Sequence, residues 1–90
     1  MSEDITRVLD AIEQADTAGG ALDAIPEDWG VFIAGRDNGE HACSMKPAGH
    51  DGVTGRIYDQ GLVMGRGATR LEAVVAAVAW MRKRDALLTA

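Results

Sequence analysis

Apolar residues recur at three- and four-residue steps at the start of the chain. Ile5, Leu9 and Ile12 lie on one stripe, and acidic residues occupy the other sides. This spacing is typical of an amphipathic helix and predicts one over residues 2–18. The glycine pair at 19–20 is expected to end that helix, because glycine adopts the left-handed conformation of a C-cap without steric cost.

Alternating apolar and polar residues occupy the middle of the chain. Such alternation in segments rich in β-branched and aromatic residues is typical of half-buried strands. Asn38-Gly39 is a strong hairpin signal, because both turn residues favour positive φ. After a connection over 21–28, we expect three strands and a short fourth, over 29–34, 41–46, 53–59 and 62–65.

Thr69 and Glu72 mark the start of a last helix, which is expected over 69–84. Their spacing is that of a capping box, in which each side chain accepts a hydrogen bond from a free backbone N–H of the first turn. Its expected core stripe consists of Leu71, Val74, Val75, Val78 and Met81. A second apolar stripe contains Trp80, which is either covered within the fold or exposed for self-association in a homodimer.

These elements predict a single α+β domain over residues 1–90. The expected order is α-β-β-β(-β)-α, an antiparallel sheet of three or four strands with two helices packed on it. Ninety residues leave no room for a second core.

Other features of the chain favour a cytoplasmic protein that does not enter a membrane. The acidic N-terminus has no apolar run behind it, as a secretory signal would require. The longest apolar run, 73–81, is far too short to span a bilayer. A single cysteine, Cys43, cannot form an internal disulfide, which fits a reducing compartment.

The net charge of −5 is distributed unevenly along the chain. Residues 1–40 carry ten acids and two bases, whereas residues 41–90 carry four acids and seven bases. Such asymmetry can mark a charged interaction surface. Alternatively, the two halves pack together and their charges cancel in space.

Candidate catalytic and metal-binding groups are few. Cys43 with His41 or His50 would be the only thiol–imidazole pair, and Asp51 could complete a metal site with them. The spacing is not that of a standard zinc site, and a mid-strand cysteine is more typical of a buried thiol. We therefore expect no enzyme activity, no metal and no cofactor.

A more distinctive surface is expected on the open side of the sheet. Phe32, Lys46, Arg56 and Tyr58 would share that face if 53–59 is a strand. Aromatic side chains beside bases are how several domains bind single-stranded nucleic acid, although the same residues also form ordinary cross-strand pairs.

The segment 63–73 leads from a strand through Gly65, Gly67 and Thr69 into an alanine-rich helix. A glycine turn of this kind before a helix can hold a phosphate group or can simply connect two elements. The junction resembles the strand–Gly-x-Thr-x-x-Glu-Ala–helix end of HicB-type antitoxins. It also resembles the last junction of double-stranded-RNA-binding domains, whose α-β-β-β-α order implies the same fold.

The RNA-binding resemblance departs at the residues that would grip phosphates. Lysines in that family correspond here to Arg70, Leu71 and Val74, so one base remains. The first helix is also acidic. The resemblance therefore implies the fold rather than RNA binding.

In its size, acidity and lack of a catalytic set, the chain also resembles small accessory proteins of bacteriophages and mobile elements, including anti-CRISPR inhibitors. This resemblance implies a non-enzymatic inhibitor or regulator of a protein with a basic surface, such as a nucleic-acid-binding complex. The acidic residues expected to contact that partner are Glu3, Asp10, Glu13, Asp16, Asp23, Glu27 and Asp28.

The alternative function is a nucleic-acid-binding or HicB-like antitoxin module. It would use the basic residues of the C-terminal half, which are Lys46, Arg56, Arg66, Arg70, Arg82, Lys83 and Arg84. The negative total charge places nucleic acid second, because affinity for it depends heavily on phosphate neutralisation.

Overall fold

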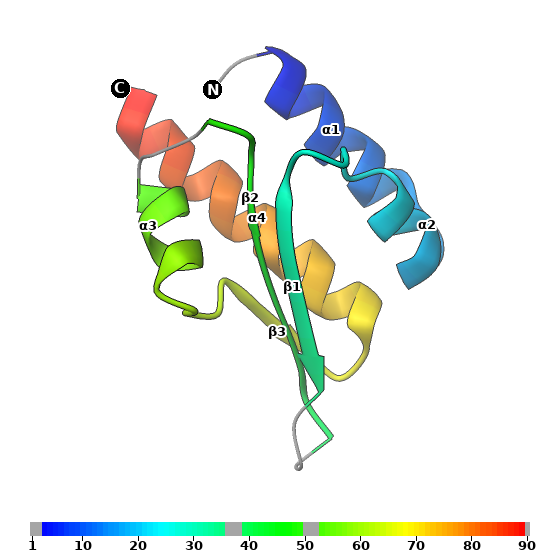
Figure 1. Ribbon diagram of the computed structural model, residues 1–90. Coiled ribbons are helices and arrows are strands. Elements are labelled where there is room, and N and C mark those ends of the chain that lie inside the picture. Colours follow the sequence, from blue (N-terminus) through cyan, green and yellow to red (C-terminus); the bar gives the residue numbers. More distant parts are fainter. Residues whose placement is uncertain (1–2, 36–38, 50–52, 90) are drawn as a thin grey trace.

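The computed structural model describes residues 3–35, 39–49 and 53–89, with side chains described for 5–35, 39–49 and 54–84. It has an α+β fold in which helices pack on a three-stranded antiparallel sheet of order β1-β2-β3 (Figure 1). The helices are α1 (Glu3–Gln14), α2 (Ala18–Asp23), α3 (Val53–Asp59) and α4 (Arg70–Thr89); the strands are β1 (Gly30–Gly35), β2 (His41–Lys46) and β3 (Gly65–Gly67).

The hairpin and the sheet agree with the sequence prediction. β1 pairs with β2 over their whole length, from Gly30 opposite Lys46 to Gly35 opposite His41. β3 continues the sheet on the other side of β2, with Gly65 opposite Cys43. Of the predicted Asn38-Gly39 turn, Asn38 lies outside the described residues, and Gly39 has the positive φ of 83° that such turns require.

The predicted strand over 53–59 is wrong, because this segment forms helix α3. Thr54, Ile57 and Tyr58 are turned inward at helical spacing, and the carbonyl of Arg56 accepts a hydrogen bond from the N–H of Gln60. The strand that pairs with β2 on its other side is instead β3, which begins at Gly65, the last residue of the strand expected over 62–65. Strand propensity is a weak preference that tertiary packing overrides.

The predicted N-terminal helix is divided in two, and Ser2, its first residue, lies outside the described part. α1 ends at Gln14, and α2 begins after Thr17, whose Oγ1 accepts a hydrogen bond from the N–H of Gly20 at 3.0 Å. The glycine pair therefore lies inside α2 and does not end the first helix, which corrects the prediction. A Thr N-cap outweighs the low helix propensity of the glycines.

The long helix α4 lies behind the sheet and packs on β2 and β3, while α1 and α2 pack against α4 (Figure 1). Helix α4 starts at the predicted capping box: the N–H of Glu72 donates to Thr69 Oγ1 at 3.1 Å, and the N–H of Ala68 donates to Glu72 Oε2 at 2.8 Å. The predicted end at residue 84 is too early. Val74, Val78 and Met81 are buried as expected, but Val75 is exposed.

Glycines on β3 allow α4 to lie directly on the strand. A Cβ at Gly65 would overlap the backbone N of Ala77 and would lie 2.5 Å from the carbonyl oxygen of Ala73. One at Gly67 would overlap the Cβ of Glu72. The glycines of this junction are thus explained by the close approach of strand and helix.

Candidate functional site

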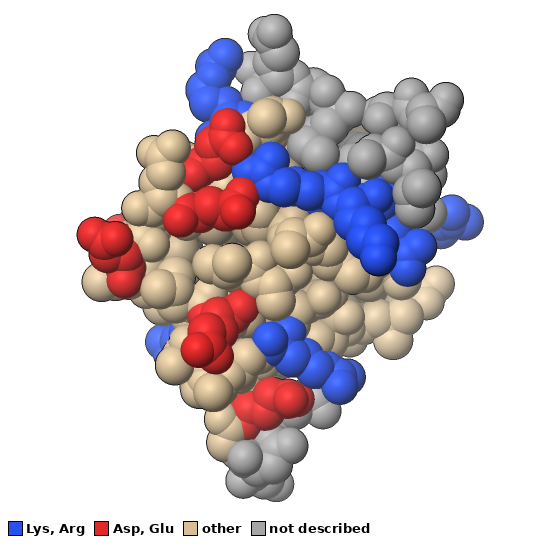
Figure 2. Space-filling model, turned by 180° about the vertical axis from the view of Figure 1, so that it is seen from behind, with Lys and Arg blue, Asp and Glu red and all other residues tan. Residues whose placement is uncertain are grey.

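The acidic and basic halves of the sequence cancel in part between α1 and α4. Arg82 donates through Nη2 to Asp10 Oδ1 at 2.7 Å and through Nε to Glu13 Oε1 at 2.7 Å. The hydrogen bond to Asp10 is the main reason that the pKa of Arg82 lies above its usual value. Figure 2 shows the face behind α4, where most acidic side chains lie on one side, most basic side chains lie on the other, and the two kinds touch where they meet. Asp10 and Glu13 are therefore engaged within the chain.

Four of the predicted acidic contact residues remain exposed and, within the described part of the chain, form no salt bridge. They lie between the end of α1 and the start of β1, around α2. We call them the acidic surface: Asp16, Asp23, Glu27 and Asp28. The side chain of Glu3 is not among the described ones. The acidic surface therefore has the exposed charge that a basic partner would require.

A pocket of about 330 Å³, six of whose seven lining residues are apolar, adjoins the acidic surface at Asp28. Its other walls come from three separate segments, namely the start of α1, the turn before β1 and the turn after β2; they are Ile5, Val8, Pro26, Trp29, Pro47 and Ala48. No sequence signal predicts this pocket, because the segments meet only in the folded chain. An apolar depression beside carboxylates suits a basic segment with one apolar anchor.

The predicted basic residues do not form one surface. Lys46 Nζ lies 3.2 Å from Asp59 Oδ1, and Arg66 Nε lies 4.0 Å from Glu40 Oε1. Arg56 is exposed on α3, Arg70 starts α4, and Lys83 and Arg84 lie more than three turns further along that helix. Binding along a nucleic-acid backbone requires several basic residues in a row on the surface. Of the seven predicted basic residues, three are paired with carboxylates.

The expected aromatic and basic face of the sheet is also absent, because Arg56 and Tyr58 belong to α3. The ring of Tyr58 instead packs over the first residue of β1. A Cβ at Gly30 would lie 2.6 Å from this ring, so a larger residue there would displace the Tyr58 side chain. Phe32 and Lys46 are left without the stacking neighbours that the prediction gave them.

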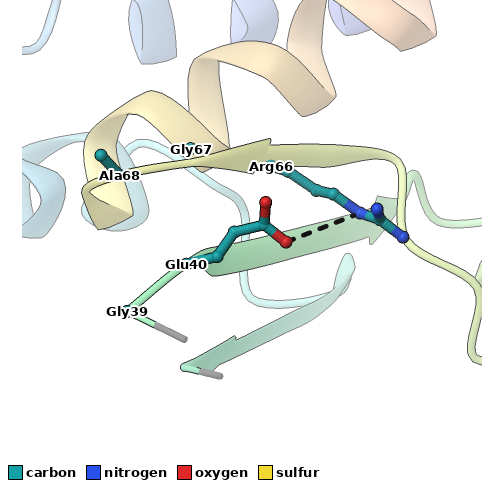
Figure 3. A pocket seen from close by; sticks show the side chains of 5 residues that line it. All are labelled: Gly39, Glu40, Arg66, Gly67 and Ala68. Carbon is teal, nitrogen blue, oxygen red and sulfur yellow. Dashed lines mark ion pairs between the residues drawn. The ribbon is translucent and has the colours of Figure 1, made fainter. Parts of the chain in front are cut away.

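The glycine junction lines a second pocket of about 330 Å³, between the β1–β2 hairpin and the start of α4 (Figure 3). Figure 3 shows Glu40 and Arg66 facing one another across it. The N–H of Ala68 already donates to Glu72, and the Glu40 carboxylate adds a negative charge. This arrangement does not favour a phosphate, since the donor and the base that would bind one are taken by carboxylates.

Cys43 is fully buried on the central strand, and this burial raises the pKa of its thiol to about 12. A thiol of this kind is a poor nucleophile and a poor metal ligand near neutral pH. His50 and Asp51 lie outside the described residues, and within the rest no three His, Cys, Asp or Glu side chains gather around one point.

Trp80 packs against the core and is half-buried. The guanidinium of Arg84, one turn further along α4, lies 5.5 Å from the centre of the Trp80 ring. This distance is within the range of a cation–π contact. The candidate residue for self-association is thus covered in part within the chain.

Comparison with models of protein families, with curated proteins and with solved structures found no match for this chain. Within the part of the chain that the structure describes, no helix is long and apolar enough to cross a membrane.

Proposed function

We propose that this protein is a non-enzymatic binding protein that regulates or inhibits a protein partner with a basic surface. One observation carries the proposal. Among the described residues, four exposed carboxylates around α2 form no ion pair within the chain, Asp16, Asp23, Glu27 and Asp28, whereas the exposed bases are divided among α3, the start of α4 and residues 83–84. Electrostatic complementarity to such a surface speeds association and selects against partners of the wrong charge.

The apolar pocket beside Asp28 supplies the second element of the proposed contact. Charged contacts at a rim contribute modestly to affinity, whereas an apolar side chain buried in a pocket contributes more. The pocket is lined by Trp29, Val8 and Pro47 among others, and it opens beside the acidic surface. The proposed partner therefore presents basic residues around one apolar or aromatic side chain.

The proposal extends to the class of partner. Basic protein surfaces commonly hold nucleic acid, so an acidic protein of this size would compete with nucleic acid for such a surface. Inhibition of a nucleic-acid-binding complex, as by phage-encoded inhibitors, is the form of regulation that we propose.

A pull-down from bacterial lysate with the tagged protein, with and without nuclease, tests the class of partner. We expect the same protein to be recovered in both lanes, and an added oligonucleotide to reduce its recovery. Recovery that disappears after nuclease treatment would contradict the proposal and favour the basic residues of α3 and α4 as a nucleic-acid-binding site.

A further inference from the structure

The outer edge of β1 is exposed in the described part of the structure. The strand order β1-β2-β3 places β1 at one side of the sheet, where β2 is its only strand neighbour among the described residues. The helix α4 packs on β2 and β3, and β1 packs chiefly on β2. Two large apolar side chains of β1 are therefore exposed, Val31 at 41% and Phe32 at 40%.

The edge carries none of the features that usually prevent strands from pairing with other chains. Natural edge strands are protected by charged residues, by proline or by a bulge. The six residues of β1, Gly30–Gly35, include no charge and no proline, and their pairing with β2 runs without an interruption in register. Free N–H and C=O groups on such an edge bind another strand readily.

We propose that this edge pairs antiparallel with β1 of a second copy of the chain, which gives a continuous six-stranded sheet. A two-fold axis perpendicular to the sheet keeps the helices of both copies on the same face. With the axis at Phe32, the register sets Phe32 opposite Phe32 of the second copy and Val31 opposite Ile33 of the second copy. Both exposed apolar side chains of each copy are then covered.

The composition of the strand identifies a second copy as the occupant. Backbone pairing accepts many strands, but the side chains of β1 match those of a second β1 about Phe32, because Phe32 then faces an aromatic ring and Val31 faces a β-branched residue. Cross-strand aromatic pairs and pairs of β-branched residues are among the favourable ones. Val31 and Ile33 also share a face with Met45 and Cys43, which belong to the core, so the core face continues across the proposed interface.

The dimer should form reversibly. Pairing of two six-residue strands buries less than the roughly 1,200–2,000 Å² of a standard stable interface. We therefore expect micromolar or weaker affinity, with monomer and dimer both present at ordinary working concentrations.

Single cysteine variants test the register. Residues directly opposite one another have Cβ atoms about 4.5–5.5 Å apart, whereas diagonal neighbours are about 7–8 Å apart, and a disulfide requires the shorter distance. Under oxidising conditions we expect Phe32→Cys to form a disulfide-linked dimer at least tenfold faster than Val31→Cys. Leu62→Cys, at an exposed position outside the sheet, reports the rate of random collision. Equal rates, or faster linkage of Val31→Cys, would overturn the proposal.

Sedimentation equilibrium gives a second test that does not use cysteine. The wild-type chain should dimerise with rising concentration, and Phe32→Lys should weaken dimerisation at least tenfold, because two lysines would face one another. Mixing Phe32→Lys with Phe32→Glu should restore dimers of the mixed kind. A wild-type chain that stays monomeric up to about 1 mM, or a Phe32→Lys variant that dimerises as well as wild type, would disprove the pairing and leave the edge to a strand of another protein.

Discussion

Arg82 near the end of α4 and Asp10 on α1 are joined by a hydrogen-bonded ion pair of 2.7 Å, across 72 residues of sequence. The same guanidinium also binds Glu13. One side chain thus links the first helix to the last, and it forms ion pairs with two of the acids that the sequence analysis assigned to a partner. Acidic residues that stabilise the fold therefore have to be distinguished from those that are available to a partner.

Replacement of Arg82 tests whether its ion pairs with α1 stabilise the fold. Arg82→Ala should lower the free energy of unfolding by about 1 kcal/mol, a modest value because the pair is partly exposed to solvent. In a domain of this size that corresponds to a fall in Tm of roughly 4–8 °C. Lys83→Ala, at an exposed position beside it, is the matched control and should change Tm little. The difference should shrink in 1 M salt, and equal stability of the two variants would contradict a structural role for Arg82.

Gly65 should be intolerant of any side chain. Gly65→Ala introduces a methyl group against Ala77 and Ala73 of α4, which forces strand and helix apart. Overpacking of this kind costs typically about 1–3 kcal/mol. Gly19→Ala on α2 is the control: its Cβ meets nothing within 4 Å, so better helix propensity should leave stability unchanged or raise it by about 0.5–1 kcal/mol. Chemical denaturation of both variants measures the contrast, and similar losses in both would show that the close approach of β3 and α4 is not required.

The buried thiol of Cys43 should make stability depend on alkaline pH. Its pKa is raised from 9.0 to about 12 in the folded chain, so between these values the unfolded chain releases a proton that the folded chain retains. The contribution is complete below pH 9 and is lost as pH rises toward 12. Urea denaturation of wild type and Cys43→Ala between pH 8 and 11 should therefore show a steeper fall for wild type. Parallel curves would mean that the thiol ionises equally well in both states.

The elements predicted correctly from the sequence are those with a local signal. The hairpin of β1 and β2 followed from alternation around Gly39, and the start of α4 followed from Thr69 and Glu72, which interact within one turn. Such features are determined by neighbours in sequence, so a pattern suffices to find them.

The features that the sequence did not predict depend on contacts between distant residues. In the segment 53–59, β-branched and aromatic residues favour a strand, but Thr54, Ile57 and Tyr58 also fit a helix that packs on β2. The pairing of Asp10 with Arg82 and the walls of the apolar pocket likewise exist only after folding. Of the candidate site, the sequence predicted the acidic residues, but it could not show which of them remain available.

The acidic surface is tested most directly by the affinity of the captured partner for two variants of equal net charge. Asp23→Asn with Glu27→Gln removes two carboxylates from the acidic surface and so changes the net charge by +2. Gln60→Lys with Ala79→Lys makes the same change in net charge at exposed positions, one in the connection from α3 to β3 and one on α4. All four positions are exposed, so both variants should fold as wild type does. We predict about tenfold weaker binding and slower association for the first variant and near wild-type affinity for the second. Equal loss in both variants, or no loss in either, would contradict the assignment of the acidic surface as the partner-binding site.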